Sequence, residues 1–403
     1  MDLKSGYPFW AVDNGLLHAF PPLAADLRCE VAVIGGGITG ALVADELAEH
    51  GHEVVVLDRR DIGWGSTAAS TALLQYEIDV PLVELSRSLG EDAAARAYRA
   101  CADAIGLLRA KAREVRDVAF ETMDSVCYAS SVRHVARLRA EHALRRRHGL
   151  GCTWLDRDAV RARYGFAAPA ALLNHPAAAV DPYRMAYRLL QRAQRRGARV
   201  FDRTDVAAVT AGGRGVVLRT ADGCRVDARR LVVAAGYESQ AWLAQKVARN
   251  RSTYAFVTDP IAATALGPLR RTLLWETARP YLYLRSTADG RLMAGGEDDA
   301  VDLPKRRDAR VEAKSRTLMR KVAALFPELP LAPVFAWAGT FAETPDGLPY
   351  FGPHPQHGPR VQFAMAYGGN GIVFSMLGAG LLRATIEGRR HPLAALFGFG
   401  RRQ

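Results

Sequence analysis

The sequence predicts an α/β fold with two domains, on the strength of three observations. At 403 residues, the chain is longer than a single hydrophobic core usually supports. Residues 31–58 have the pattern of a strand, a glycine-rich turn, a helix and a second strand, which is the unit of a parallel sheet covered by helices. Between about residues 250 and 338 the pattern changes to mostly short β-strands, which sets this part of the chain apart from the first unit.

Three glycines follow a strand that we expect to be buried on both faces, since Val31–Ile34 is a continuous apolar run. Gly35, Gly37 and Gly40 have the spacing G-x-G-x-x-G. The first permits a tight turn, the second lets a pyrophosphate approach the backbone, and the third lets the next helix pack closely on the strand. This spacing predicts the phosphate-binding turn of a Rossmann-type nucleotide-binding unit.

The segments after the glycines complete this unit. We expect a helix over 38–50, ended by Gly51, and a second strand over 52–57. Asp58 closes that strand, in the place where an acid can bond a ribose hydroxyl. The N-terminus of the helix offers unpaired N–H groups and the positive end of a dipole to the phosphates.

A loop rich in Gly, Ser, Thr and Ala follows at Asp61–Asp79. Small residues let the backbone approach a large flat ligand, and hydroxyl and N–H groups can bond phosphates. A flexible loop without a ligand has the same composition, so this segment alone leaves both interpretations open.

The rest of the chain alternates between helices and strands. Asp181 and Pro182 are a typical N-cap and first helical residue, for a helix that ends before Gly197. A small β-meander is expected over 206–228, and Leu231–Gly236 has the pattern of a buried strand ending in a glycine turn. Further helices are expected at 91–114, 134–148, 156–164, 309–325 and 372–387, and further strands at 120–122, 125–129, 199–201, 253–258, 273–276, 281–285, 291–295 and 361–366.

The composition excludes several other classes of protein. The net charge of +12 arises mostly from scattered arginines without aromatic residues between them, so we expect no nucleic-acid partner. The five cysteines show no C-x-x-C pair and no metal-ligand spacing, which predicts no metal site and a reducing compartment. Neither a signal peptide nor an apolar span of about 18 residues is evident, so we expect a cytoplasmic protein without a transmembrane segment.

Several separated segments together match one family. They are VAVIGGGITG, GSTAASTALL, AAAVDPYRMAYRLL, LVVAAGYESQAWL, TPDGLPYFGP and AYGGNGIVFSMLGAGLL, and they extend from residue 31 to about residue 388. In these motifs the chain resembles the D-amino-acid oxidase family of flavoenzymes, which includes glycine, sarcosine and γ-glutamylputrescine oxidases. The resemblance implies a glutathione-reductase-like FAD-binding domain with a discontinuous sequence and a substrate domain built on a mixed β-sheet. We expect the FAD-binding domain to comprise 1–85, 150–248 and 339–403, and the substrate domain 86–149 and 249–338.

The resemblance also assigns residues to the cofactor. The glycines would hold the FAD pyrophosphate, Asp58 the adenosine ribose, and the backbone of Val206 the adenine edge. The start of the last predicted helix would face the flavin ring, where its positive end stabilises the negative charge of the reduced ring. The complete set is Gly35, Gly37, Ile38, Thr39, Gly40, Asp58, Arg59, Gly65, Ser66, Thr67, Ala68, Ala69, Val206, Ala235, Gly236, Gly369, Asn370, Gly371 and Ile372.

The chain departs from its relatives at four positions. Gly339 and Ala69 stand where some relatives carry a cysteine or a histidine bonded to the flavin, so we expect non-covalent FAD. Phe341 stands where glycine-oxidase-like relatives place an arginine that pairs with the substrate carboxylate. Val373 stands where sarcosine-oxidase-like relatives place a lysine. Because both carboxylate anchors are absent, a small α-amino acid bound in the usual pose is not expected.

The remaining candidates for substrate contact each have a structural alternative. Arg285 is either a relocated anion anchor or a charge on a strand. Glu77 either binds a cationic amine or pairs with a structural arginine. The aromatic residues of the predicted strands either line a pocket or belong to the core, namely Tyr254, Trp275, Tyr281 and Tyr283. The predicted substrate set is Tyr76, Glu77, Tyr254, Arg285, Phe341 and Glu343, and no catalytic residue is assigned.

The implied activity is FAD-dependent oxidation of the C–N bond of an amine or amino acid. A hydride passes to flavin N5, the imine hydrolyses, and O₂ or another acceptor reoxidises the flavin. Two alternatives stay open, namely hydroxy-acid oxidation on the same fold and a non-catalytic FAD-binding subunit of a larger oxidase. The sequence does not indicate the oligomeric state.

Overall fold

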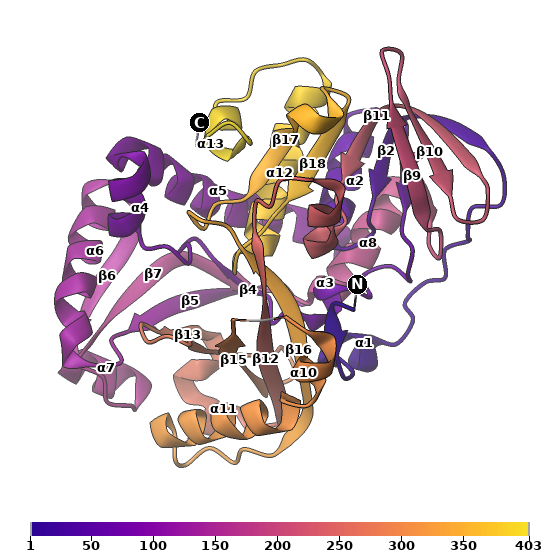
Figure 1. Ribbon diagram of the computed structural model, residues 1–403. Helices are drawn as coiled ribbons and strands as arrows, with labels where there is room; N and C mark the ends of the chain where they lie inside the picture. The colour runs from indigo at the N-terminus through magenta and orange to yellow at the C-terminus, as the bar shows by residue number, and fades with distance from the viewer. Residues whose placement is uncertain (1, 301, 402–403) are drawn as a thin grey trace.

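The computed structural model describes residues 2–300 and 302–401, which fold around two β-sheets (Figure 1). One sheet has eight strands and the other ten. This mixed α/β architecture confirms the fold class expected from the sequence.

The eight-stranded sheet carries the predicted nucleotide-binding unit. Its path runs β17-β18-β11-β2-β3-β8, in which every pairing from β18 to β8 is parallel and only the edge strand β17 is antiparallel. A β9–β10 hairpin continues from β11. The strands are β2 (Leu27–Ile34), β3 (Val54–Leu57), β8 (Arg199–Phe201), β9 (Val206–Ala211), β10 (Val216–Thr220), β11 (Arg225–Val233), β17 (Tyr350–Pro353) and β18 (Val361–Met365).

Helices cover one face of this sheet. Because successive strand residues point to opposite faces, neighbouring residues of β2 belong to different cores. Val31 and Val33 of β2 pack against the helices, whereas Ala32 and Ile34 pack into a second core with the β9–β10 hairpin. The helices on this side are α2 (Ile38–Glu49), α5 (Glu91–Val115), α8 (Pro182–Arg195) and α12 (Gly371–Ile386).

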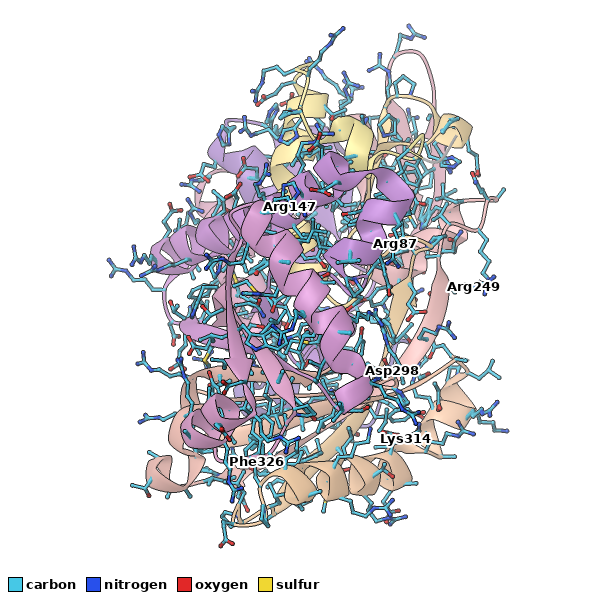
Figure 2. The ribbon with its side chains drawn as sticks, turned by 90° about the vertical axis from the view of Figure 1, so that its left-hand side faces the viewer. Arg87, Arg147, Arg249, Asp298, Lys314 and Phe326 are labelled. Atoms are coloured by element: carbon cyan, nitrogen blue, oxygen red, sulfur yellow. The ribbon has the colours of Figure 1, made fainter. Side chains whose placement is uncertain are left out.

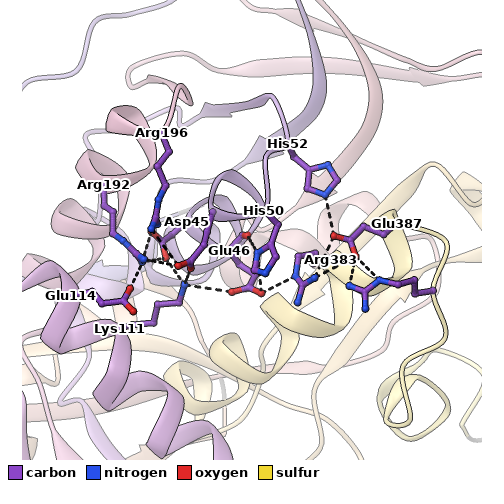
Figure 3. Close-up of polar contacts among 12 residues, drawn as sticks. Asp45, Glu46, His50, His52, Lys111, Glu114, Arg192, Arg196, Arg383 and Glu387 are labelled. Carbon is purple, nitrogen blue, oxygen red and sulfur yellow. Dashed lines mark hydrogen bonds and ion pairs between the residues drawn. The ribbon is translucent and has the colours of Figure 1, made fainter.

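A network of charged side chains joins these four helices (Figure 3). Asp45 of α2 is completely buried, and its carboxylate lies 2.9 Å from Lys111 Nζ of α5 and 2.8 Å from Arg192 Nη1 of α8. Glu46, next to it on α2, accepts a hydrogen bond of 2.8 Å from Arg383 Nε of α12. Buried carboxylates of this kind are tolerated only when they are paired and hydrogen-bonded, so the network fixes the helices relative to one another.

The ten-stranded sheet is antiparallel except where β13 pairs with β5. Its path runs β1-β16-β12-β15-β14-β13-β5-β7-β4, with β6 paired to β7. The strands are β1 (Lys4–Ser5), β4 (Leu73–Gln75), β5 (Glu121–Tyr128), β6 (Gly151–Asp156), β7 (Ala170–Ala179), β12 (Arg249–Pro260), β13 (Thr272–Glu276), β14 (Leu282–Ser286), β15 (Arg291–Asp299) and β16 (Pro333–Glu343).

Other helices pack beside this second sheet. Residues of α7 and α11 pack with it in one core, and α4 and α6 contact each other beside it. Of the helices in the described chain, none has the length and apolar character needed to cross a membrane. The remaining helices are α1 (Phe9–Asn14), α3 (Ser66–Ala69), α4 (Leu82–Leu89), α6 (Val135–Arg147), α7 (Arg157–Tyr164), α9 (Ala263–Leu266), α10 (Pro304–Asp308), α11 (Val311–Leu325) and α13 (Ala394–Phe397).

The sheets do not follow the predicted domain boundaries at four segments, and the domain division itself stays a prediction. Residues 4–5, 73–75, 151–179 and 339–343 were expected in the FAD-binding domain, but β1, β4, β6, β7 and the end of β16 pair within the ten-stranded sheet. The two parts also share a core, because Ala255, Met293 and Trp337 of the second sheet belong to the same apolar cluster as α2 and α12. The pairing of strands depends on contacts between segments that are distant in the sequence, and local sequence patterns do not predict these contacts.

Candidate functional site

A cavity of about 460 Å³ is lined by residues of both sheets. At one end lie the glycines after β2, and at the other lie aromatic residues of β13 and β14. The segment 63–75 and the start of α12 line the cavity between these ends. The cavity therefore runs from the predicted nucleotide site into the second sheet.

The glycine turn has the close contacts that its spacing predicts. Gly35 has a φ of +108°, and a Cβ there would lie 2.4 Å from the carbonyl oxygen of Ala234. At Gly40, a Cβ would lie only 1.8 Å from the carbonyl oxygen of Gly35. Gly40 does not itself line the cavity, and its role is to bring α2 close to the strand end.

Asp58 lies at the end of β3 and lines the cavity. Its Oδ2 accepts a hydrogen bond of 2.6 Å from Gly36 N, and its Oδ1 accepts one of 2.8 Å from Arg60 N. Burial raises the pKa of Asp58 to about 6 despite these two hydrogen bonds. Arg59 and Arg60 reach across to Glu238, which follows β11, so charged groups enclose this end of the cavity.

The segment after β3 is hydrogen-bonded to the start of α2. Thr67 Oγ1 accepts a hydrogen bond of 2.9 Å from Ile38 N, one of the orphan donors at the helix N-terminus. Ser66 also lines the cavity, and its Oγ is buried with no hydrogen-bond partner in the described residues. Buried hydroxyls normally have a partner, so Ser66 fits a ligand with acceptor oxygens such as a pyrophosphate.

Three consecutive carbonyl groups of the next residues are held by side chains from distant elements. Trp337 Nε1 of β16 donates to the carbonyl of Ala69 at 2.9 Å, and Trp10 Nε1 of α1 donates to that of Ser70 at 2.7 Å. Arg285 Nε of β14 donates to the carbonyl of Thr71 at 2.6 Å. These contacts fix the conformation of the segment that lines the middle of the cavity.

The start of α12 lies opposite that segment and also lines the cavity. Asn370 Nδ2 donates to the carbonyls of Gln75 and Glu77 at 3.2 and 2.6 Å, and Gly369 N donates to Asp79 Oδ2 at 2.7 Å. These bonds position the positive end of the α12 dipole at the cavity wall.

Aromatic and acidic side chains line the far end. Tyr281 Oη donates to the carbonyl of Asp79 at 3.4 Å, its ring lies under the Arg279 guanidinium, and Trp275 packs against its edge. We call this end the aromatic chamber, and define it by Asp79, Trp275, Arg279, Tyr281, Tyr283 and Asp298. Sequence reasoning considered the three aromatic residues but missed Asp79 and Asp298, because an acid at a loop or strand end has no distinctive local pattern.

The predicted cofactor residues lie in or beside the cavity. Ala68 is buried behind the wall, like Gly40. Those that line the cavity are Gly35, Gly37, Ile38, Thr39, Asp58, Arg59, Gly65, Ser66, Thr67, Ala69, Val206, Ala235, Gly236, Gly369, Asn370, Gly371 and Ile372.

Of the six predicted substrate residues, Phe341 lines the cavity. Tyr76 is buried and donates to the carbonyl of Gly151, and Glu77 is buried and accepts from Ser125 Oγ at 2.6 Å. Tyr254 donates to Asp299 on the side of α11, and Glu343 pairs with Arg251. Arg285 is the fifth, and it donates hydrogen bonds to backbone carbonyls. These five side chains therefore make their polar contacts outside the cavity lining.

Comparisons with known proteins agree with this architecture. The chain is 28% identical over 381 residues to glycine oxidase of Geobacillus kaustophilus (strain HTA426), covering 90% of this chain and 94% of the relative. It is 26% identical over 398 residues to gamma-glutamylputrescine oxidoreductase of Escherichia coli (strain K12), covering 94% and 88%. The crystal structure of glycine oxidase from Geobacillus kaustophilus superposes with a TM-score of 0.77 at 22% identity, covering 93% of this chain and 99% of that one.

A second solved structure has the same fold. L-amino acid deaminase from Proteus vulgaris, with its specific insertion sequence deleted, superposes with a TM-score of 0.76 at 17% identity, covering 96% of this chain and 97% of that one. A family model described as "DAO: FAD dependent oxidoreductase" matches residues 30–385. The chain therefore belongs to the DAO family of FAD-dependent oxidoreductases, and FAD is its cofactor.

Proposed function

We propose that this enzyme oxidises the C–N bond of an amine or amino acid. The observation that carries this proposal is the continuity of the cavity from the glycine turn after β2 to the aromatic chamber. A cofactor bound along the first part would present its reactive end to a substrate in the second. The relatives named as glycine oxidase and gamma-glutamylputrescine oxidoreductase support the assignment to amines and amino acids.

The residues of the glycine-rich end fit the adenosine diphosphate part of FAD. Gly35 and Gly37 leave room for the pyrophosphate, and Ser66 Oγ supplies a hydroxyl that has no partner in the described chain. Asp58 would hold the ribose, and the backbone of Val206 the adenine edge. FAD supplies a ring system that accepts a hydride at N5.

The middle of the cavity would hold the flavin ring. Ala69 and its neighbours form one wall, and the start of α12 at Gly371 forms another. The first turn of α12 has unpaired N–H groups, and its dipole favours negative charge at that position. In the described part of the chain neither a cysteine nor a histidine lines the cavity, which supports non-covalent FAD.

The aromatic chamber would hold the substrate. Trp275, Tyr281 and Tyr283 limit the water around it, which favours the neutral form of the reacting amine. Oxidation removes a hydride from the carbon and a proton from the nitrogen and leaves an imine. Water then hydrolyses the imine to an aldehyde or keto acid and releases ammonia or an amine.

The test is anaerobic reduction of the purified, FAD-loaded enzyme. We expect at least one compound among primary amines, diamines, N-methyl amino acids and D- or L-amino acids to bleach the flavin absorption and release a carbonyl product. Bleaching by hydroxy acids without nitrogen release would replace this proposal by hydroxy-acid oxidation. Full FAD loading without bleaching by any compound of the panel would indicate an FAD-binding subunit.

The same enzyme also tests the electron acceptor. If O₂ is the acceptor, mixing the reduced enzyme with air restores the flavin colour and yields H₂O₂. If recovery requires an added quinone or dye, the enzyme is a dehydrogenase. We further propose a reducing, cytoplasmic location, because all five cysteines are unpaired.

A further inference from the structure

The acid Asp298 stands out among three consecutive acids at the end of β15. Side chains alternate along a strand, so Glu297 and Asp299 point to one face and Asp298 to the other. The backbone is irregular here, since Gly296 and Glu297 both have positive φ and the pairing with β12 shifts register. Bulges of this kind redirect side chains, and here Asp298 is directed to the cavity.

Cations on or near α11 neutralise the two flanking acids. Lys314 and Lys321 pair with Glu297, the latter at 2.6 Å. Arg310 and Lys314 pair with Asp299 at 2.8 and 3.3 Å. Figure 2 shows Lys314 below Asp298, on the side of the strand end where α11 lies.

Asp298 has no such cation within ion-pair distance in residues 2–300 and 302–401, and its Oδ1 is buried with no hydrogen-bond partner there. Burial raises its pKa to about 6, and the neighbouring Asp79 acts in the same direction. Thr253 and the more distant Arg279 guanidinium oppose this rise in pKa, but they leave the Oδ1 atom of the half-buried carboxyl without a hydrogen-bond partner. A buried acceptor atom without a partner is costly, so a bound cation that donates to Oδ1 would relieve that penalty.

The surrounding groups also favour a positive charge. Asp79 adds a second carboxylate to the chamber, and Trp275, Tyr281 and Tyr283 offer aromatic faces that attract cations. The chamber's one arginine in the described lining, Arg279, is exposed, stacks on Tyr281 at 3.8 Å and donates to the carbonyl of Asp79. Phe341, which also lines the cavity, is apolar and offers no positive charge to a carboxylate.

We propose that Asp298 binds an ammonium group of the substrate that is not the one oxidised, so that the preferred substrate is an aliphatic diamine. This inference rests on the proposed amine oxidation. One amino group is oxidised to the imine and released as ammonia after hydrolysis, while the other stays protonated against Asp298. An α-amino acid presents a carboxylate to the same acids and is disfavoured by like charge.

Binding is measured by calorimetry on the FAD-loaded enzyme after anaerobic reduction with dithionite, because the reduced enzyme cannot oxidise an amine. The probes are α,ω-diamines of three to six carbons, with the n-alkylamine and ω-amino acid of each length. For at least one length, we expect the affinity of the diamine to exceed those of the alkylamine and the ω-amino acid by about tenfold or more. A charge-assisted hydrogen bond predicts a difference of this size. Equal affinities of diamine and alkylamine at every length would overturn the proposal.

The variant Asp298→Asn keeps the shape of the side chain and removes its charge. We expect it to bind the diamine about tenfold more weakly than the native enzyme does, and no better than it binds the alkylamine. Asp298→Ser is the second variant, and Glu312→Gln on the exposed face of α11 is the matched control that should retain diamine selectivity. Diamine selectivity that persists in either FAD-loaded Asp298 variant would contradict the role of this residue.

Bleaching of the oxidised enzyme separates this proposal from the proposed function. If amino acids bleach the flavin and diamines do not, amine oxidation stands and the role of Asp298 fails. If no amine or amino acid of either panel bleaches it, the proposed function fails and the calorimetric result for Asp298 still reports whether the chamber binds a cation.

Discussion

The Nε atom of Arg285 lies 2.6 Å from the carbonyl oxygen of Thr71, so a buried guanidinium from the second sheet holds the segment that lines the middle of the cavity. The same side chain donates from Nη2 to the carbonyl of Val180 at 2.9 Å. Trp337 and Trp10 hold the two preceding carbonyls of that segment in the same way. The wall of the cavity therefore depends on elements far away in the sequence.

Replacing Arg285 by methionine should weaken both folding and FAD binding. The carbonyls of Thr71 and Val180 would lose their donor, at about 1–3 kcal/mol for each group left unsatisfied and buried. Urea unfolding and the FAD content of the purified protein measure the two effects. Arg219→Met, on an exposed position of β10, is the matched control. If Arg285→Met retained native stability and FAD content but lost affinity for carboxylate substrates, Arg285 would be an anion anchor.

Gly40→Ala should prevent the protein from binding FAD. The added Cβ would lie 1.8 Å from the carbonyl oxygen of Gly35, and only backbone movement of the phosphate-binding turn could relieve that overlap. The flavin absorption of the purified protein measures the loss. Gly213→Ala, where a Cβ meets no atom within 4 Å, should leave FAD content unchanged. A fully loaded Gly40→Ala protein would refute the predicted role of this packing contact.

Asp45→Asn should destabilise the protein strongly, because Lys111 and Arg192 would lose a buried countercharge. Breaking one partner of a buried ion pair costs about 3–5 kcal/mol. Glu84→Gln, which removes an exposed pair with Arg137, should cost less than about 1 kcal/mol. Chemical denaturation of the three proteins gives the comparison, and equal losses in both variants would disprove the structural role of the buried network.

Diamine binding should depend on pH through Asp298. Burial raises the pKa of Asp298 to about 6, where Thr253 and Arg279 oppose the rise and Asp79 and Glu343 add to it. Because a raised pKa keeps the proton on the carboxyl up to about pH 6, diamine affinity should fall by about tenfold per unit below that pH and level off above it. Asp79 is unchanged in the Asp298→Asn variant. The difference between the pH profiles of diamine affinity for the native enzyme and for the variant therefore reports the titration of Asp298. Parallel profiles for the two proteins between pH 5 and 8 would contradict this assignment.

The flavin should be released by acid precipitation of the protein. The resemblance to the family places Gly339 and Ala69 where some relatives are expected to bond the flavin covalently, and the described cavity lining includes neither cysteine nor histidine. Absorbance of the supernatant and of the redissolved pellet measures the distribution of flavin. Yellow colour that stays with the pellet after washing in denaturant would show a covalent bond.

Local patterns predicted most elements of the fold. The helix after the glycines, the helix capped by Asp181 and the arginine-rich helix 134–148 appear as α2, α8 and α6. Their signals are short-range, namely apolar periodicity, capping residues and glycine at the ends. The expected strands at 120–122 and 125–129 form one strand, β5, whose pairing with β7 shifts register between Met123 and Ser125. Strand pairing of this kind depends on partners that the local pattern does not specify.

In the candidate site, too, the residues that belong to local motifs were predicted from the sequence, and those that depend on distant partners were not. Gly35, Asp58 and Gly371 lie in motifs in which the residue type and its neighbours in sequence together indicate the chemistry. Tyr76 and Glu77 were predicted because they follow the glycine- and serine-rich loop, and Arg285 because of its charge. The structure places all three in hydrogen bonds outside the cavity lining. Asp298 was missed because nothing in its local sequence separates it from Glu297 and Asp299.

The sequence by itself determined the fold class, the family and the FAD cofactor. Those properties depend on backbone geometry near glycines and helix ends, which a few adjacent residues specify. The tertiary structure alone decided which acid faces the cavity and which acids are neutralised, because the pairing of β15 with its neighbours and the position of α11 set those partners. The charge that a buried carboxylate presents to a ligand is a property of its surroundings, and these come from segments distant in the chain.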